Sequence, residues 1–222
     1  MVSENQAGGE MRPMRQKSVQ GKETPRGRVE LMSYVTPGDL DGLALDEGIG
    51  VFPRYRSILT SKQSLMALAA NQDANLCLAV HEKSRIIGYC VRRLPPAGER
   101  WAMMQPPVLY ELFGENARGW RDLGLMKPML AMVVNEPENE ERILYIVGYS
   151  WHWDLDGSPK TLPQYRETII HLLAPFGFKP YPTNERNVNL RPENLFMARI
   201  GDKVDQNARR RFTNLLFGLT ED

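Results

Sequence analysis

The stretch PVLYELFGENARGWRDLGLMKPMLAMVV, residues 107–134, carries a strand pattern and a helix pattern joined by a short loop. Residues 107–114 form an apolar run of strand length, and residues 124–134 form an apolar run typical of a buried helix. The most hydrophobic strand pattern in the chain, RILYIVGYSW at residues 142–151, follows an acidic loop. Two neighbouring strands that are bridged by a helix lie parallel in a sheet. We therefore expect a parallel pair formed by residues 107–114 and 142–151.

Hairpin, strand and helix patterns surround this unit. Two apolar strand patterns at residues 75–81 and 85–93 are separated by a short polar link and predict a hairpin. Further strands are predicted at residues 29–35, 177–181 and 194–200, and helices at residues 37–44, 59–72, 163–175 and 206–217. These elements predict an α/β fold, with a mixed, mostly antiparallel sheet, one parallel strand pair and helices on both faces.

Length and composition favour one folded domain preceded by a tail. The chain has 222 residues, of which 42% are hydrophobic, and this is enough for a real core. Residues 1–28 are rich in Gly, Arg, Lys and Gln and contain almost no large aliphatic side chains. We therefore expect a flexible basic tail at residues 1–28 and a single domain at residues 29–222.

Charge and hydropathy exclude several classes of partner. The formal net charge of +1 gives no reason to expect nucleic acid or an anionic membrane. No apolar run approaches the roughly 18 residues of a membrane-spanning helix, and the N-terminus lacks the apolar segment of a secretory signal. The histidines and cysteines show no zinc-ligand spacing. We expect a cytoplasmic protein that holds no metal.

Cys77 and Cys90 fall in the two arms of the predicted hairpin. If His81 pairs with Ile86, Cys77 lies opposite Cys90, and a cross-strand disulfide is conceivable. Two reduced thiols in the core of a cytosolic protein are the favoured interpretation, because free cysteine is among the most buried residue types.

The loop between the strand predicted at residues 107–114 and the helix predicted at residues 124–134 has the composition of a phosphate-binding turn. It contains Arg118, Gly119, Arg121 and Gly124 just before the helix pattern. Glycine lets the backbone approach a ligand closely, and the first turn of a helix offers unpaired N–H groups and a positive dipole end. Arginine adds charge-assisted hydrogen bonds to phosphate. The alternative is an ordinary connection between a strand and a helix.

The run YSWHWDLDG, residues 149–157, concentrates aromatic and polar side chains. In a strand, its alternation would place Trp151 and Trp153 on one face, with His152 and Asp154 on the other. Tryptophans in a strand usually pack in a core. Here they stand at the carboxyl end of a predicted parallel strand, where ligands bind in such sheets. This position favours a wall of a ligand site over core packing.

Several motifs together resemble the GNAT acyl-CoA N-acyltransferases. The sequence RDLGLM at residues 121–126 stands where that family has Q/R-x-x-G-x-G/A, and Gly177-Phe178 follows an amphipathic helix as it does in the family. Within the family, WHWDL at residues 151–155 and MARIG at residues 197–201 are most similar to the acetoin-utilization acetyltransferases. The resemblance covers nearly everything but the tail.

The resemblance implies direct transfer of an acetyl group from acetyl-CoA to an amine. The parallel strands are expected to splay apart, so that the pantetheine arm lies between them as a surrogate strand. The residues expected to bind acetyl-CoA are Arg118, Gly119, Arg121, Leu123, Gly124, Met126 and Lys127. The candidates for proton transfer are Glu111, Glu115, His152, Asp154 and Tyr165, and those for substrate contact are Tyr149, Trp151 and Trp153. The expected acceptor is a protein lysine, such as the catalytic lysine of an AMP-forming acetyl-CoA synthetase.

Departures from the family pattern bear on this activity. Met126 replaces the last small residue of the signature, and Pro128 removes one backbone donor from the first helical turn. Leu173 stands where many members have the tyrosine that protonates the leaving thiolate. The remaining candidates for that acid are Tyr165, Tyr149 and His152. Two alternatives stay open: a GNAT enzyme that acetylates a small amine, and a non-catalytic module that binds acyl-CoA as a sensor.

Overall fold

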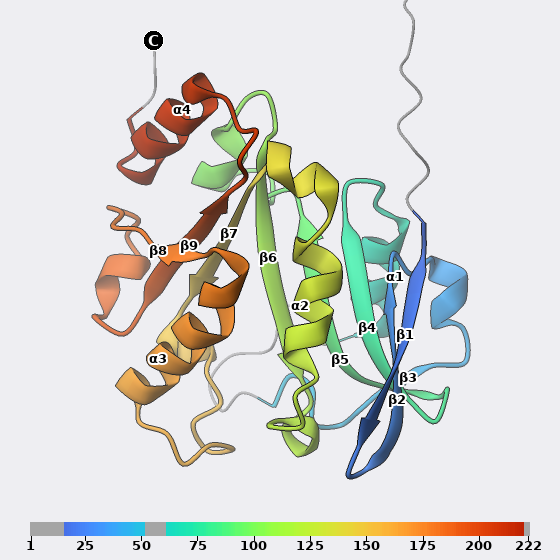
Figure 1. Cartoon of the computed structure of the whole chain (residues 1–222). Coiled ribbons are helices and arrows are strands. Elements are labelled where there is room, and N and C mark those ends of the chain that lie inside the picture. Colours follow the sequence, from blue (N-terminus) through green and yellow to red (C-terminus); the bar gives the residue numbers. More distant parts are fainter. Residues whose placement is uncertain (1–15, 52–60, 220–222) are drawn as a thin grey trace, which may run out of the picture.

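The computed structural model describes residues 16–51 and 61–219 and shows a mixed sheet with helices on both faces (Figure 1). In this described part the sheet has nine strands, in the order β1-β2-β4-β5-β6-β7-β9-β8, with β3 paired to β5. The strands are β1 (Ser18–Thr24), β2 (Gly27–Ser33), β3 (Ala44–Leu45), β4 (Asn75–His81), β5 (Arg85–Arg93), β6 (Leu109–Asn116), β7 (Ile143–Gly148), β8 (Lys179–Pro180) and β9 (Leu195–Ile200). The α-helices are α1 (Lys62–Ala70), α2 (Met126–Val134), α3 (Leu162–Leu173) and α4 (Gln206–Leu216).

β6 and β7 form the parallel pair that the sequence predicts, and α2 lies in the connection between them. Their register contains three pairs: Leu109 with Ile143, Tyr110 with Leu144, and Glu111 with Tyr145. The other neighbours along the main strand order are antiparallel, and β3 adds a short parallel pairing to β5. The predicted mixed, mostly antiparallel sheet is confirmed.

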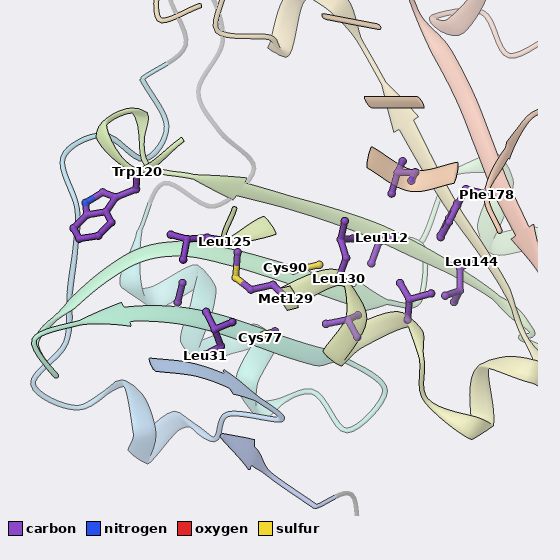
Figure 2. Close-up of a cluster of buried hydrophobic side chains, with 14 of the residues drawn as sticks. Leu31, Cys77, Cys90, Leu112, Trp120, Leu125, Met129, Leu130, Leu144 and Phe178 are labelled. Atoms are coloured by element: carbon purple, nitrogen blue, oxygen red, sulfur yellow. The ribbon is translucent and has the colours of Figure 1, made fainter. Parts of the chain in front are cut away.

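The two faces of the sheet are covered by different helices, and the strand side chains alternate between them. On β4, Cys77 points into a cluster with Met129 of α2, whereas Leu78 packs into a cluster with Leu65 of α1. α4 covers the second face further along the sheet, where Phe212 is fully buried. Figure 2 shows the first cluster, which gathers side chains from the strands and α2. We call these two sides the α2 face and the α1 face.

A β-bulge sets the register of the β4–β5 hairpin. His81 pairs with Arg85 rather than with Ile86, and one extra residue of β5 is accommodated before the pairing continues. The bulge restores the predicted pairing of Cys77 with Cys90. Both thiols are free and buried, and burial raises the pKa of Cys77 to about 12. A thiol with this pKa stays protonated at neutral pH and is therefore unreactive.

The predicted flexible tail at residues 1–28 is wrong for its second half. Residues 1–15 lie outside the described residues, but β1 is an edge strand that pairs with all seven residues of β2. The turn Pro25-Arg26 joins the two strands, and Gly27 follows it with a φ of +105°. β1 lacks the apolar alternation of a half-buried strand, because most of its side chains are exposed.

β7 ends at Gly148, earlier than the strand predicted at residues 142–151. Ser150–His152 form a single 3-10 turn instead. The expectation that both indoles share one face of a strand is therefore wrong. Trp153 is buried in the cluster of the α2 face, whereas Trp151 is partly exposed. Aromatic residues have high strand propensity, and for this reason the predicted strand includes Tyr149 and Trp151, which lie beyond the end of β7.

Two predicted helices are shorter in the structure. The helix expected at residues 37–44 is a 3-10 helix, Pro37–Leu40, followed by β3. Thr36 acts as its N-cap, and its backbone N–H donates to the carboxylate of Asp39 at 2.8 Å. The helix expected at residues 59–72 is α1, and the first two residues of that prediction lie outside the described residues.

A buried polar network fixes the C-terminal end of α2. The last carbonyls of a helix lack partners within it, and the side-chain amide of Asn139 donates to those of Val133 and Val134 at 2.9 Å. Arg92 is fully buried and bonds Glu136 at 2.8 Å and Asn139 at 2.7 Å. Because a buried charge without a partner is costly, this network holds α2 in one place over β5.

Candidate active site

β6 and β7 part from each other beyond the pair formed by Glu111 and Tyr145. In the described register they share no further pair, although β6 continues to Asn116 and β7 to Gly148. The backbone groups on the two facing edges are thus open to a ligand that runs between the strands. Gly114 lies in this segment and is exposed. The expected splayed strand pair is present.

The loop at residues 117–125 lies at the end of this gap and leads into α2. The amide of Ala117 donates to the carbonyl of Ile87 at 2.8 Å and fixes the start of the loop to β5. Gly124 has a φ of +70°, which favours glycine. The residues expected to hold acetyl-CoA all lie on this loop or the first turn of α2. Of these, Arg118, Gly119, Gly124 and Lys127 are exposed, and Arg121, Leu123 and Met126 are half-buried.

Asp154 connects the two sides of the gap. It follows β7, is fully buried, and accepts two hydrogen bonds from Arg118, from Nε to Oδ2 at 2.8 Å and from Nη2 to Oδ1 at 2.7 Å. Arg121 Nη1 donates to Oδ2 at 2.5 Å, and the amide of Gly157 donates to Oδ1 at 3.0 Å. Burial acts to raise the pKa of Asp154, but the hydrogen bonds from Arg118 and Arg121 outweigh it and lower that pKa. Asp154 thus ties the segment after β7 to the loop before α2.

This geometry suits Asp154 to position the two arginines rather than to accept a proton. A carboxylate with a lowered pKa, whose oxygens already accept several hydrogen bonds, is a weak base. The side chain of Arg118 is 42% exposed, so solvent and a phosphate can reach its guanidinium group. One buried carboxylate therefore holds two guanidinium groups beside the loop at residues 117–125.

Glu111 lies on the α1 face at the point where the strands part. Its Oε2 accepts a hydrogen bond from Nε of Arg93 at 2.9 Å and forms an ion pair with Nη2 of Arg93 at 2.8 Å. Burial raises the pKa of Glu111, and the charge of Arg93 opposes only part of that rise. Across the pair, the hydroxyl of Tyr145 is buried and has no hydrogen-bond partner among the described residues. A carboxyl group with a raised pKa is closer to the value that general-base catalysis needs at neutral pH.

Glu115 lies four residues further along β6, in the segment that is not paired with β7, and on the same face. Only 8% of its surface is exposed. Oε1 accepts a hydrogen bond from the amide of Gly50 at 2.8 Å, and Oε2 accepts one from the hydroxyl of Tyr89 at 3.1 Å. The two glutamates predicted as bases therefore line the same side of the gap.

The two tryptophans of the YSWHWDLDG run have different environments. Trp153 is 7% exposed and stacks on Tyr165 of α3, with ring centroids 5.1 Å apart. Trp151 stacks on Tyr149 with centroids 4.8 Å apart, and His152 meets both rings edge-on. The predicted substrate wall is thus divided between a buried stack on the α2 face and an aromatic cluster that is partly exposed.

Burial shifts the pKa values of the three candidates for general acid. It raises the pKa of Tyr149 to about 12, with a contribution from Glu185, and it also raises the pKa of Tyr165. It lowers the pKa of His152, because a buried imidazolium loses its hydration. At neutral pH both tyrosines therefore keep the proton that a general acid must deliver.

Some neighbours of the site escaped sequence prediction. Arg26, in the turn between β1 and β2, donates from Nη1 to the carbonyl of Gly119 at 2.6 Å. No motif links these two residues, because strand pairing across the sheet brings them together. Arg93 was within reach of prediction, since it lies directly opposite Glu111 in the antiparallel register of β5 and β6.

Known proteins with similar sequences or structures were compared with this chain. No family model matches the chain. The acetoin utilization proteins AcuA of Bacillus licheniformis and Bacillus subtilis are each 28% identical over 196 residues, which cover 88% of this chain and 91% of each relative. The crystal structure of an acetoin utilization protein from Exiguobacterium sibiricum 255-15 has a TM-score of 0.82 at 28% identity, covering 92% of this chain and 96% of that chain. The GNAT domain of S. lividans PAT shares the fold, with a TM-score of 0.52 at 10% identity, over 81% of this chain and 95% of that one.

The chain has the GNAT fold. Its GNAT features are the single splayed parallel pair, the loop that leads into α2, and the helices on both faces. Arg118 and Arg121 lie on the loop before α2, and Glu111 and Glu115 lie on β6, the strand that precedes it. None of the helices in the described part of the chain is long and apolar enough to cross a membrane.

Proposed function

We propose that this protein is an acetyl-CoA-dependent N-acetyltransferase that acetylates a lysine of another protein. The observation that carries this proposal is the divergence of β6 and β7 after Glu111 and Tyr145. It leaves an edge of free backbone groups between a loop suited to phosphate and two glutamates suited to deprotonate an amine. The GNAT fold and the similarity to the acetoin utilization proteins AcuA support the proposal.

The residues around the gap fit acetyl-CoA. Arg118, Arg121 and Lys127 would neutralise its phosphates, and the free edge of β6 would bond its pantetheine arm. When bound, acetyl-CoA supplies the activated acetyl group.

The glutamates would prepare the acceptor for attack. A lysine amine has a pKa of about 10.4 and is almost wholly protonated at neutral pH, so it must lose a proton first. Glu111 and Glu115 line the gap from the α1 face, and either can take that proton directly or through water. Tyr165 and Tyr149 are the candidates to protonate the leaving thiolate, since Leu173 occupies the position of the tyrosine that many GNAT enzymes use.

The proposed acceptor is the catalytic lysine of an AMP-forming acetyl-CoA synthetase, and its acetylation would regulate acetate and acetoin metabolism in the cytoplasm. The names of the relatives, acetoin utilization proteins, support a role in acetoin metabolism. Glu99 and Glu185 add negative charge near Glu111 and Tyr149 on the α1 side of the gap, and this charge suits a cationic acceptor.

The test is acetylation of a purified AMP-forming acetyl-CoA synthetase in the presence of this protein and acetyl-CoA. Mass spectrometry should find one acetyl group on the catalytic lysine, and synthetase activity should fall in parallel. A synthetase with arginine at that lysine serves as the control. If acetyl-CoA binds in calorimetry but the synthetase stays unmodified while a free polyamine is acetylated, the proposed acceptor is wrong.

A further inference from the structure

The β1–β2 hairpin places a lysine on the side of the sheet that α2 covers. In the register of the two strands, Lys22 stands opposite Val29, and Val29 is fully buried in the cluster of the α2 face. Side chains that are directly opposite in an antiparallel pair share a face. Lys22 therefore projects toward α2, and Figure 1 shows the hairpin at the sheet edge beside that helix.

The tip of the hairpin is fixed to the loop at residues 117–125. Arg26 donates to the carbonyl of Gly119 at 2.6 Å, and its guanidinium carbon lies 5.3 Å from the ring centroid of Trp120. His81 packs on the same indole, with centroids 4.7 Å apart, and its Nε2 lies 3.1 Å from the carbonyl oxygen of Arg26. The hairpin and the loop thus keep a fixed relative position.

Lys22 reaches the last glycine of this loop. Its Nζ lies 3.7 Å and its Cε 3.8 Å from the position that a Cβ of Gly124 would occupy. The same lysine lines a groove of about 630 Å³ together with Gly124 and Lys127, and Pro175 and Phe176 form an apolar part of its lining. Within residues 16–51 and 61–219, neither Lys22 nor Lys127 forms an ion pair with an acidic side chain.

We propose that this groove binds the phosphate-bearing nucleotide end of acetyl-CoA and that Lys22 contacts one of its phosphates. The inference rests on the proposed function. Two ammonium groups without acidic partners suit a phosphate, which they contact as point charges. The apolar surface of Pro175 and Phe176 suits an adenine ring. β1 therefore extends the binding site beyond the loop and the first turn of α2.

Calorimetry on the full chain tests this assignment with two probes, acetyl-CoA and adenosine 3′,5′-bisphosphate. Lys22→Gln should weaken the binding of both probes by a similar factor, about five- to twentyfold, because one charge-assisted contact in a partly exposed site is lost. Lys22→Arg should restore most of the affinity. Arg28→Gln is the matched control, because it removes one positive charge from the same hairpin, where Arg28 approaches Glu23 at 4.0 Å.

The outcomes separate this inference from the proposed function. If the wild-type protein fails to bind acetyl-CoA, the proposed function fails and the inference fails with it. If wild type binds acetyl-CoA and Lys22→Gln binds both probes equally well, the inference alone is wrong. It is also wrong if Lys22→Gln weakens only acetyl-CoA, or if Arg28→Gln has the same effect. Melting curves of the variants check that all of them fold.

Discussion

Arg118 bonds both carboxylate oxygens of Asp154, with Nε 2.8 Å from Oδ2 and Nη2 2.7 Å from Oδ1. The two residues lie on opposite sides of the splayed strands, one after β6 and the other after β7. Their contact therefore bridges the gap in which we propose that acetyl-CoA binds. It also explains why an aspartate in an aromatic run matters to a loop that lies more than thirty residues away in sequence.

Asp154→Asn should weaken the binding of acetyl-CoA by about tenfold, because both arginines lose the charge that holds them beside the loop. Stability should fall by about 1–3 kcal/mol, toward the lower end since Arg118 is partly exposed and solvent screens the pair. Calorimetry and thermal unfolding measure the two effects. A variant that retains full affinity and loses only turnover would show that Asp154 acts in proton transfer instead.

The same pair predicts a pH dependence of stability. The pKa of Asp154 is lowered in the folded state. Its stabilising contribution is then fully present above the unfolded pKa of about 3.9 and is lost as the pH falls through the folded value. The stability difference between wild type and Asp154→Asn should therefore shrink below about pH 4. Unfolding by denaturant across this range gives the comparison, and a difference that grows toward acid would contradict it.

Glu111→Gln should reduce kcat/KM by about 10²- to 10⁴-fold if Glu111 is the general base. The pKa of Glu111 is raised by burial, so the wild-type rate should fall as the pH decreases through a value above the usual 4.3 or so for glutamate. The residual activity of Glu111→Gln should lack this decrease at acidic pH. Glu115→Gln is the matched comparison on the same strand. If Glu115→Gln alone removes the decrease in rate at acidic pH, the base is Glu115.

Trp153→Ala should destabilise the fold by about 3–5 kcal/mol, because it removes a buried ring, and Trp153 is 7% exposed and stacks on Tyr165. Trp151→Ala should cost less than about 1 kcal/mol, since its ring is partly exposed. Any loss of activity in Trp151→Ala would then report a direct contact with the acceptor. Thermal unfolding and acetylation rates of the two variants provide the test, and equal destabilisation would refute the distinction.

Both cysteines should resist modification by thiol reagents in the folded protein. Cys77 and Cys90 are buried, and burial raises the pKa of both thiols, that of Cys77 to about 12. Little thiolate is therefore present at neutral pH. Labelling should become rapid only when the chain unfolds, and a spectrophotometric thiol assay with and without denaturant measures this. Rapid labelling of the native protein would show that the strands carrying the thiols open readily.

Much of the fold could be predicted from local patterns, as the β4–β5 hairpin shows. Its two strands have the predicted bounds, and Cys77 lies opposite Cys90 although a bulge changes the pairing near the turn. Continuous apolar runs with a short link leave few alternatives. β1 could not be found in this way, because an edge strand with exposed side chains carries no such pattern.

The sequence predicts which residues belong to the candidate site, but not which of them bond to each other. The loop at residues 117–125 and the glutamates of β6 were identified from the sequence, and they lie at the gap. The bonds from Arg118 and Arg121 to Asp154 depend on how the two strand ends approach each other, which no local pattern encodes. Lys22 could not be predicted for the same reason, because its neighbour Gly124 is distant in sequence.

The short pairing between β6 and β7 has a mechanical consequence. Three residue pairs join these strands, whereas β5 with β6 and β7 with β9 share six each. The strands up to β6, with α1 and α2, and the strands from β7 onward, with α3 and α4, are therefore two halves that meet along a narrow seam. A ligand that fills the gap would act as an additional strand and stiffen the whole sheet. Within residues 112–116, the amides that face the gap rather than β5 should exchange hydrogen rapidly in the free protein and slowly once the seam is filled.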